Sequence, residues 1–381
     1  SGPTHTSPRW SRSRASSKRG AEGVDYRGRL EKLQRTLPEH GVDALLVTNL
    51  VNVRYLTGFS GSNGQVLITP GEVGFFTDGR YEARAKDLVH EATIDIYLTR
   101  LSDVLAPRLA AASVLTLGIE GATVTLAQRD DLVARLGGVD LKATNGLVEH
   151  LRRRKEPAEV DLIREAIALA DRAYEWLLDR IEPGATESRI ALDLEMWMRT
   201  SGADELSFEP IVGSGPLSAH IHHTPSDRSL EKGDLVVADF GCKIAGYCSD
   251  LTRTVVLGPA TDGQQRIYDL VLRANSAAFE AMRAGSSGRE VDAAARRIIT
   301  EAGHGDDFGH GLGHGLGLEV HEAPRCARIS EDTLVAGDVV TNEPGVYVRG
   351  SGGVRIEDCV LITADGAEAL TSAPKDQLIE L

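Results

Sequence analysis

The sequence predicts an α/β protein of two domains, the second of which is built from two similar halves. Three observations support this prediction. Helical and strand-like periods alternate from residue 26 to about residue 145. A basic stretch that ends in proline, residues 151–157, then marks a domain boundary. Beyond it, a pair of helices precedes an apolar strand twice over. We therefore expect domains at 26–150 and 151–381.

The first domain is expected to begin with a helix over residues 26–39, because Leu30, Leu33 and Leu37 lie at helical spacing. Short apolar runs then predict strands at 42–47, 65–68 and 73–77, with turns between them. The glycine-rich segment 57–64 lacks the Lys-Ser/Thr ending of a phosphate-binding loop, so we interpret it as a turn. This domain is therefore a small α/β unit.

In the second domain, helices are expected near 160–182 and 187–200, and again near 262–283 and 289–302. Each pair precedes a strand with one shared pattern, a Gly-Asp turn, three apolar residues, one further residue and a carboxylate. The carboxylates are Asp239 and Glu343, each six positions after the glycine. A second acid follows each strand on another apolar stretch, Asp250 in the first half and Glu357 in the second. The repeat predicts an internal pseudo-twofold.

Clustered carboxylates at the ends of buried strands indicate a metal site. An ionised carboxylate in an apolar interior costs several kcal/mol, so such acids take up protons unless cations hold them ionised. The glycine-dense segment 309–321 adds three histidines, of which His314 is the candidate ligand. Four carboxylates and one histidine suit two divalent ions, with Mn²⁺ favoured over Co²⁺ or Zn²⁺ by the oxygen-rich set. Two such ions can activate water and polarise a carbonyl, which predicts hydrolysis of a peptide or similar amide.

Composition excludes several other classes. The net charge is −14 and the first 22 residues are basic, so the rest of the chain is still more acidic. An acidic protein is repelled by nucleic acid and by anionic membranes, so neither is an expected partner. Residues 1–25, rich in Ser, Arg and Pro, suit a disordered tail or cloning remnant, with a transit peptide as the alternative. Without a signal peptide or long apolar run, a cytoplasmic enzyme is expected. The four cysteines, expected to be reduced and buried, are Cys242, Cys248, Cys326 and Cys359.

At these motifs the sequence resembles the proline-specific metallopeptidases of the pita-bread fold, the prolidase and aminopeptidase P group. The resemblance runs from about residue 26 to residue 381 and includes segments 43–47, 52–59 and 77–81 of the first domain. It implies a small three-layer α/β domain of the creatinase type before a pita-bread catalytic domain, and a homodimer. By the same resemblance Asp239 binds one ion, Asp250 and Glu357 bridge both, and His314 and Glu343 complete the set.

The resemblance also implies roles beyond metal binding. Glu343 would be the general base. Three histidines, His222, His310 and His321, would line the substrate cleft, while Arg355 and Tyr347 would support the ligands. His222 is chosen from a cluster with His220 and His223, and these neighbours stay open as alternatives because segment 217–222 departs from the family pattern.

We therefore expect an Xaa-Pro dipeptidase, favoured over an Xaa-Pro aminopeptidase because the chain is short. The remaining alternatives are a non-catalytic binding protein on the same fold and a metal-free hydrolase of the creatinase type. A serine hydrolase built on Ser214 or Ser218 is disfavoured because no nucleophile elbow surrounds either residue.

Overall fold

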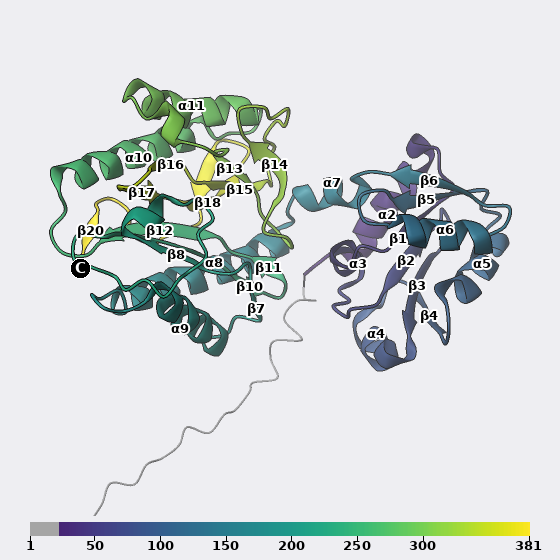
Figure 1. Ribbon diagram of the computed structural model, residues 1–381. Helices are drawn as coiled ribbons and strands as arrows, with labels where there is room; N and C mark the ends of the chain where they lie inside the picture. The colour runs from purple at the N-terminus through teal and green to yellow at the C-terminus, as the bar shows by residue number, and fades with distance from the viewer. Residues whose placement is uncertain (1–22) are drawn as a thin grey trace, which may run out of the picture.

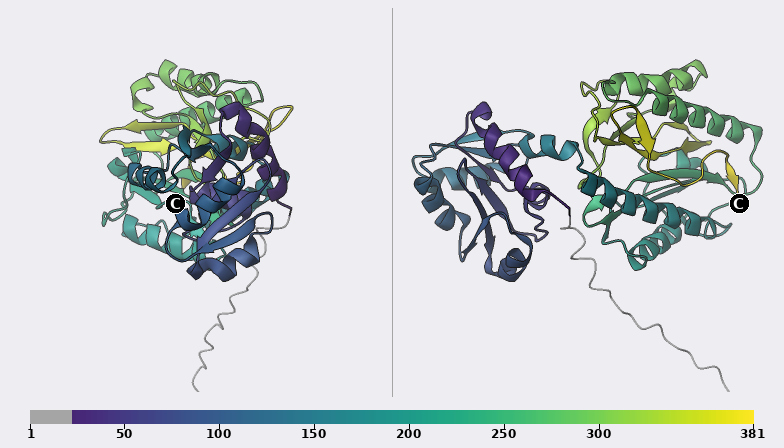
Figure 2. Two further views of the ribbon diagram at one scale, coloured as in Figure 1. Left: turned by 90° about the vertical axis from the view of Figure 1, so that its right-hand side faces the viewer. Right: turned by 180° about the vertical axis from the view of Figure 1, so that it is seen from behind.

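The computed structural model describes residues 23–381 and shows two lobes joined by a short helix (Figure 1). The expected N-terminal tail lies outside the described residues except for its last three. Figure 2 shows the lobes side by side again from behind, and one in front of the other when the molecule is turned by 90°. Among the described helices, none combines the length and apolar character needed to cross a bilayer.

The first lobe is one mixed sheet between two layers of helices. The strand order is β4-β3-β2-β1-β5-β6, antiparallel at β1–β2 and β2–β3 and parallel elsewhere. Neighbouring residues of β1 face opposite layers, since Leu45 packs in one buried cluster and Leu46 in another. The strands are β1 (Ala44–Val47), β2 (Gln65–Ile68), β3 (Val73–Asp78), β4 (Thr93–Tyr97), β5 (Thr116–Glu120) and β6 (Asp140–Thr144). This is the predicted three-layer domain.

The helices of the first lobe divide between the two faces of the sheet. They are α2 (Tyr26–Thr36), η1 (Leu37–His40), α3 (Leu50–Thr57), η2 (Gly79–Tyr81), α4 (Glu82–Leu88), α5 (Leu101–Ala111), α6 (Leu126–Arg135) and α7 (Leu147–Arg153). The expected helix over 26–39 is thus an α-helix continued by a 3₁₀ turn, which Gly41 ends with a left-handed φ of 61°. Helix α7 leads out of this lobe and toward the second one (Figure 1).

The second lobe repeats one arrangement twice, as predicted. Its first half is α8 (Pro157–Leu178), α9 (Glu187–Thr200), β7 (Glu205–Leu206), β8 (Ile211–Ser214), η3 (Gly215–Ala219), β9 (Leu235–Phe240), β10 (Cys242–Ile244), β11 (Tyr247–Cys248) and β12 (Leu251–Val256). Its second half is α10 (Asp262–Ala281), α11 (Gly288–Glu301), η4 (Gly305–Asp307), β13 (Gly313–Gly315), β14 (Glu322–Cys326), β15 (Val339–Asn342), β16 (Gly345–Val348), β17 (Gly352–Arg355), β18 (Asp358–Ile362), β19 (Ala367–Ala369) and β20 (Ile379–Glu380).

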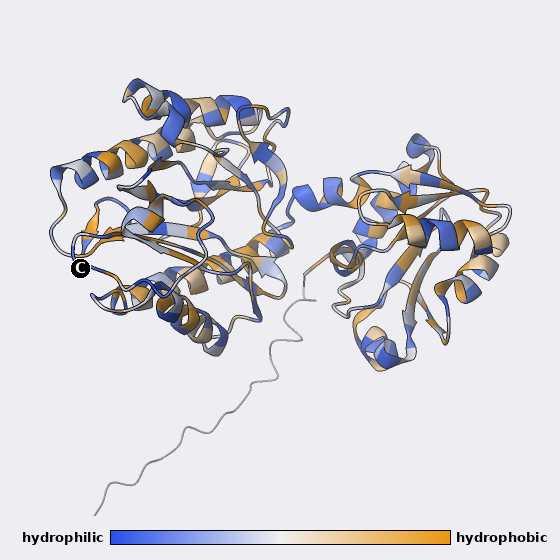
Figure 3. Cartoon of the chain, in the orientation of Figure 1, coloured by the Kyte–Doolittle hydropathy of each residue, from blue (hydrophilic) through white to orange (hydrophobic). Residues whose placement is uncertain are grey.

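The sheets of the second lobe lie between the two helix pairs. Antiparallel β9 and β12 form the centre of the sheet β20-β12-β9-β8, and antiparallel β15 and β18 belong to the sheet β14-β13-β15-β18-β19. Two smaller sheets, β11-β10-β7 and β16-β17, complete the lobe. Helices α10 and α11 cover one side, and α8 and α9 cover the other (Figure 1). Orange apolar segments concentrate on the strands and on the inner faces of these helices (Figure 3).

The two Gly-Asp turns that open the matched strands have the same construction. Gly233 and Gly337 both adopt left-handed backbone, with φ values of 90° and 95°. In each turn the aspartate accepts a 2.8 Å hydrogen bond from the backbone N–H three residues earlier and pairs with an arginine. The strand registers differ, because Asp239 lies opposite Thr252 whereas the second pair ends at Asn342 opposite Asp358. The halves therefore share a turn but present their carboxylates differently.

A single buried apolar cluster continues from the first lobe into the second. It contains Leu30, Val53 and Phe59 from the first lobe and Ile163, Tyr247 and Leu316 from the second. The lobes are therefore packed against each other and are not merely tethered by a linker.

Candidate active site

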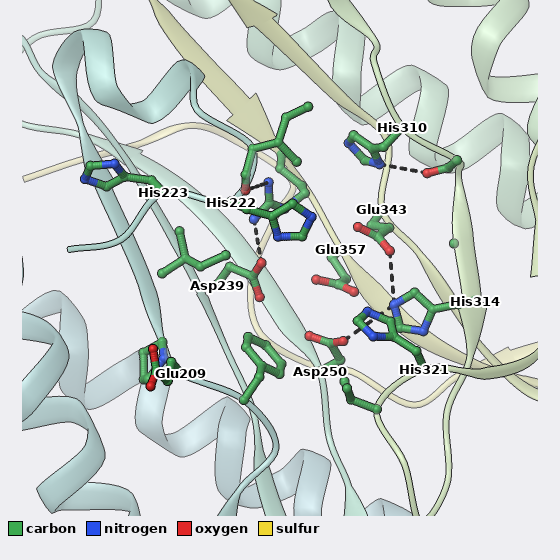
Figure 4. Close-up of a pocket in the computed structure, with 18 of the residues that line it drawn as sticks. Glu209, His222, His223, Asp239, Asp250, His310, His314, His321, Glu343 and Glu357 are labelled. Carbon is green, nitrogen blue, oxygen red and sulfur yellow. Dashed lines mark hydrogen bonds and ion pairs between the residues drawn. The ribbon is translucent and has the colours of Figure 1, made fainter. Parts of the chain in front are cut away.

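Five ionisable side chains from both halves of the second lobe converge on one cavity (Figure 4). The first half contributes Asp239, near the end of β9, and Asp250, directly before β12. The second half contributes His314 in β13, Glu343 directly after β15, and Glu357 between β17 and β18. These are the five ligands expected from the sequence, and the fold brings all of them to the same cavity.

His314 lies close to two of the carboxylates. Its Nδ1 donates to the Gly315 carbonyl at 3.1 Å, which turns Nε2 toward the carboxylates. Nε2 lies 3.3 Å from Glu343 Oε1 and 3.8 Å from Asp250 Oδ2. One ligand atom each of Asp250, His314 and Glu357 lies within 4.8 Å of the other two, a spacing that fits one cation.

Asp239 has one oxygen engaged and one bare. Arg355 Nη2 donates to Oδ2 at 2.5 Å, while the buried Oδ1 has no hydrogen-bond partner within residues 23–381. A buried acceptor without a partner costs free energy, so an unpaired carboxylate oxygen facing three further acids is a position that a cation would fill. The residues therefore fit a divalent-metal centre.

The electrostatics of the site lead to the same conclusion. Burial, followed by the charge of Glu357, raises the pKa of Asp250 well above its ordinary value. Burial, followed by the charges of Glu343 and Asp239, does the same to the pKa of Glu357. Burial also opposes ionisation of Glu343, but the hydrogen bond with His314 and the charges of His314, His310 and Arg355 together outweigh burial and lower the pKa of Glu343. Without cations these acids compete for protons, and bound cations would relieve the repulsion between them.

A chain of hydrogen bonds supports the ligands from behind. Thr252 Oγ1 donates to Glu357 Oε2 at 2.6 Å and accepts from Arg355 Nε at 3.0 Å. Arg355 Nη1 donates to the Tyr347 hydroxyl at 2.9 Å, and that hydroxyl lies 2.9 Å from His310 Nε2. Arg355, of the predicted supporting pair, therefore contacts Asp239 directly, and Tyr347 is joined to Asp239 through Arg355.

The three predicted cleft histidines all line the cavity, in different environments. His310 Nδ1 donates to the Gly311 carbonyl at 2.7 Å and Nε2 faces Tyr347, so both ring nitrogens are engaged. His321 packs edge-on against His314 with ring centroids 4.3 Å apart, and its side chain is exposed to the cleft. His222 lies beside the carboxylates in Figure 4, whereas His223 turns away to pair with Glu187 at 2.7 Å.

Several lining residues were not identified from the sequence. The cavity, about 480 Å³ in volume, has the apolar side chains Phe208, Ile221 and Val320 on its walls, and the exposed cation Arg325. Thr252 could have been found from its position, because it lies two residues after Asp250 and so faces the same side of its strand. Ser214 and Ser218 are buried and donate to Glu187 and to the Gly215 carbonyl, which leaves neither as a nucleophile.

Fold and site together define a metal-dependent hydrolase. Residues 161–364 match metallopeptidase family M24, and residues 29–154 match the creatinase/prolidase N-terminal domain. The chain is 37% identical over 352 residues to an Xaa-Pro dipeptidase from Pyrococcus furiosus, covering 92% of this chain and 99% of that protein. The chain therefore belongs to metallopeptidase family M24 and is a metallopeptidase with the pita-bread fold.

Solved structures agree with this assignment. An Xaa-Pro dipeptidase from Bacillus anthracis superposes with a TM-score of 0.91 at 40% identity, covering 93% of this chain and 100% of that one. An X-Pro aminopeptidase from Thermotoga maritima superposes with a TM-score of 0.86 at 34% identity, covering 92% and 100%. Both proline-specific activities therefore occur among proteins similar to this chain.

Proposed function

We propose that the protein hydrolyses the peptide bond before proline and that Xaa-Pro dipeptides are its preferred substrates. The observation that supports this most strongly is the complete set of four carboxylates and His314 around one cavity, next to the exposed cation Arg325. A non-catalytic binding protein or a metal-free hydrolase would not need these five residues, so their presence disfavours both alternatives.

We assign metal binding to Asp239, Asp250, His314, Glu343 and Glu357. Two divalent ions bound there would polarise the peptide carbonyl and activate water for attack. Glu343 acts as general base and then returns the proton to the proline nitrogen. Its lowered pKa keeps the carboxylate ionised, which is the form that a general base needs.

The surrounding residues orient these groups and the substrate. Arg355 holds Asp239 in place, and Tyr347 links Arg355 to His310. Because both ring nitrogens of His310 are engaged, we assign it to the support of Tyr347. His222 and His321 are left to contact the substrate.

The preference for a dipeptide rests on charge. A dipeptide presents its carboxylate close to the scissile bond, and Arg325 lines the cavity with no ion pair to its side chain among the described residues. Chain length does not discriminate, because the Thermotoga maritima aminopeptidase is fully covered by this chain. Xaa-Pro aminopeptidase activity on longer peptides remains the second candidate, favoured by that structural match.

We also propose the metal, the oligomeric state and the compartment. We propose Mn²⁺ as the working metal on the oxygen-rich ligand set, with Co²⁺ or Zn²⁺ as alternatives. We propose a homodimer on the family resemblance alone. We propose the cytoplasm as the compartment because all four cysteines are free and buried.

The test is to remove metal from the protein, to restore Mn²⁺, Co²⁺ or Zn²⁺ separately, and to offer Ala-Pro, Ala-Pro-Ala and Ala-Ala. Metal-dependent cleavage of Ala-Pro alone is the expected result. Cleavage of Ala-Pro-Ala at a comparable kcat/KM would assign the aminopeptidase, and absence of metal-dependent cleavage of both proline peptides would refute the proposal. Arg325→Met should raise KM for Ala-Pro at least tenfold and leave KM for Ala-Pro-amide nearly unchanged.

A further inference from the structure

A buried guanidinium outside the cavity holds the loop that carries His321. Arg152, at the end of α7, has a side chain only 2% exposed. Its Nη2 donates to Glu322 Oε1 at 2.5 Å and to Glu319 Oε2 at 2.8 Å, so it contacts residues on both sides of His321. Arg152 itself does not line the cavity.

The loop is fastened by further contacts that depend on Glu322. Its Oε1 also accepts the Glu319 N–H at 3.0 Å, and its Oε2 lies 3.3 Å from Lys155 Nζ. Burial opposes ionisation of Glu322, but Lys155 and Arg152 outweigh this effect and lower its pKa. The neighbouring Gly317 makes room for this carboxylate, since a Cβ there would lie 2.7 Å from Glu322 Oε2. Segment 317–322 is therefore held by one charged cluster, Arg152, Lys155 and Glu322, which we call the anchor.

The same guanidinium connects the anchor to the first lobe. Arg152 Nη1 donates to Asn52 Oδ1 at 2.8 Å, and Asn52 is fully buried in α3. The Asn52 amide in turn donates to Glu120 and Glu149, each at 2.7 Å. A continuous polar network thus runs from β5 of the first lobe to the wall of the active-site cavity.

We propose that Arg152 is a positioning residue for hydrolysis: it fixes segment 317–322 and thereby the ring of His321, and Asn52 makes this position depend on docking of the first lobe. A buried guanidinium suits this task because its planar fork holds several acceptors in fixed directions. A displacement of about 1 Å at a reacting centre can cost roughly 100-fold in rate. The kinetic part of this inference rests on the proposed function.

The principal variant is Arg152→Met, which keeps the length of the side chain and removes the fork. We expect kcat/KM for Ala-Pro to fall by roughly 30- to 100-fold, mainly in kcat. Arg153→Met is the matched control, because Arg153 lies next to Arg152 and pairs with buried Asp338, away from the cavity. The control should lower the melting temperature and leave kcat and KM within twofold of wild type.

A double-mutant cycle distinguishes positioning from a general structural effect. If Arg152 acts through His321, adding Arg152→Met to His321→Ala should lower kcat/KM by no more than about threefold beyond His321→Ala alone. An additive loss, or wild-type kinetics for Arg152→Met, would overturn the proposal. If Arg152→Met does not fold, Arg152→Lys replaces it, because lysine keeps the charge but cannot reach all three partners. We then expect kcat/KM to fall by three- to tenfold. Unchanged kinetics would refute the proposal.

Two further measurements complete the test. Asn52→Leu should reduce kcat/KM in the same direction, and an unchanged value would reject the dependence on the first lobe. Amide hydrogen exchange of segment 316–322 should accelerate in Arg152→Met and not in Arg153→Met. Exchange needs no turnover, so it tests the anchor even if wild type fails to cleave Ala-Pro, a result that would contradict only the proposed function. Unchanged exchange in Arg152→Met would contradict the anchor itself.

Discussion

We predict that Thr252 controls how strongly Glu357, a proposed ligand, binds a metal ion. Its hydroxyl is buried, donates to Glu357 at 2.6 Å and accepts from Arg355 at 3.0 Å. Thr252→Val removes both hydrogen bonds with little change in shape. A hydrogen bond to a charged group contributes about 1.5–3 kcal/mol, and about 1.4 kcal/mol corresponds to a factor of ten. We therefore expect metal affinity to fall by roughly 10- to 100-fold, the range typical of lost outer contacts to a ligand.

The assay is titration of Mn²⁺ or Co²⁺ into the metal-free protein, followed by calorimetry and by recovery of Ala-Pro hydrolysis. Thr254→Val is the matched control, because Thr254 lies on the same face of β12 and its hydroxyl bonds only to the Arg355 backbone, at 3.0 Å. Both variants should be destabilised, but only Thr252→Val should bind metal more weakly. Equal affinities for Thr252→Val and wild type would refute the reasoning that the hydroxyl tunes the carboxylate.

Three other predictions follow from the site and its surroundings. Glu343→Gln should lower kcat by about 100- to 10,000-fold, the contribution of a general base, and near-normal turnover at saturating metal would remove that role. Chelation should lower the melting temperature, and readdition of metal at about 100 times its Kd should restore roughly 2.7 kcal/mol, as measured by urea unfolding. Burial opposes ionisation of Glu187, but hydrogen bonds from Ser214, Ser226 and His223 lower its pKa below 4.5. That contribution to stability is present above pH 4.5 and is lost as the pH falls through the folded-state pKa, so wild type should lose more stability than Glu187→Gln between pH 5 and about pH 3.

The sequence predicted that these five residues would gather at one place, and they line one cavity, because they lie in short motifs whose spacing is local. Gly233 and Gly337 set identical turns, and the strand period then places Asp239 and Glu343 near the ends of their strands. The long helix that opens the second lobe could also be predicted, since α8 begins at Pro157 and ends one residue before Asp179, close to the expected span.

The parts that could not be predicted depend on contacts between distant segments. Arg152 reads as one of several basic residues before Pro157, and nothing local shows that it is buried against Glu319 and Glu322. Similarly, the sequence alone could not separate His222 from His220 and His223. In the structure His223 pairs with Glu187 and so points away from the carboxylates. Contacts between residues more than 30 positions apart, and the burial that they cause, leave no periodic pattern in a single sequence.

The division of the ligands between the two halves of the second lobe has a consequence for synthesis of the protein. Of the five proposed ligands, Asp239 and Asp250 come from the first half, and the other three come from the second. A growing chain therefore holds no complete ligand set until Glu357 has left the ribosome and the halves have closed on each other. On the proposed assignment, a partly made or half-folded chain therefore lacks part of the metal site, and closure of the two halves is the step that completes it.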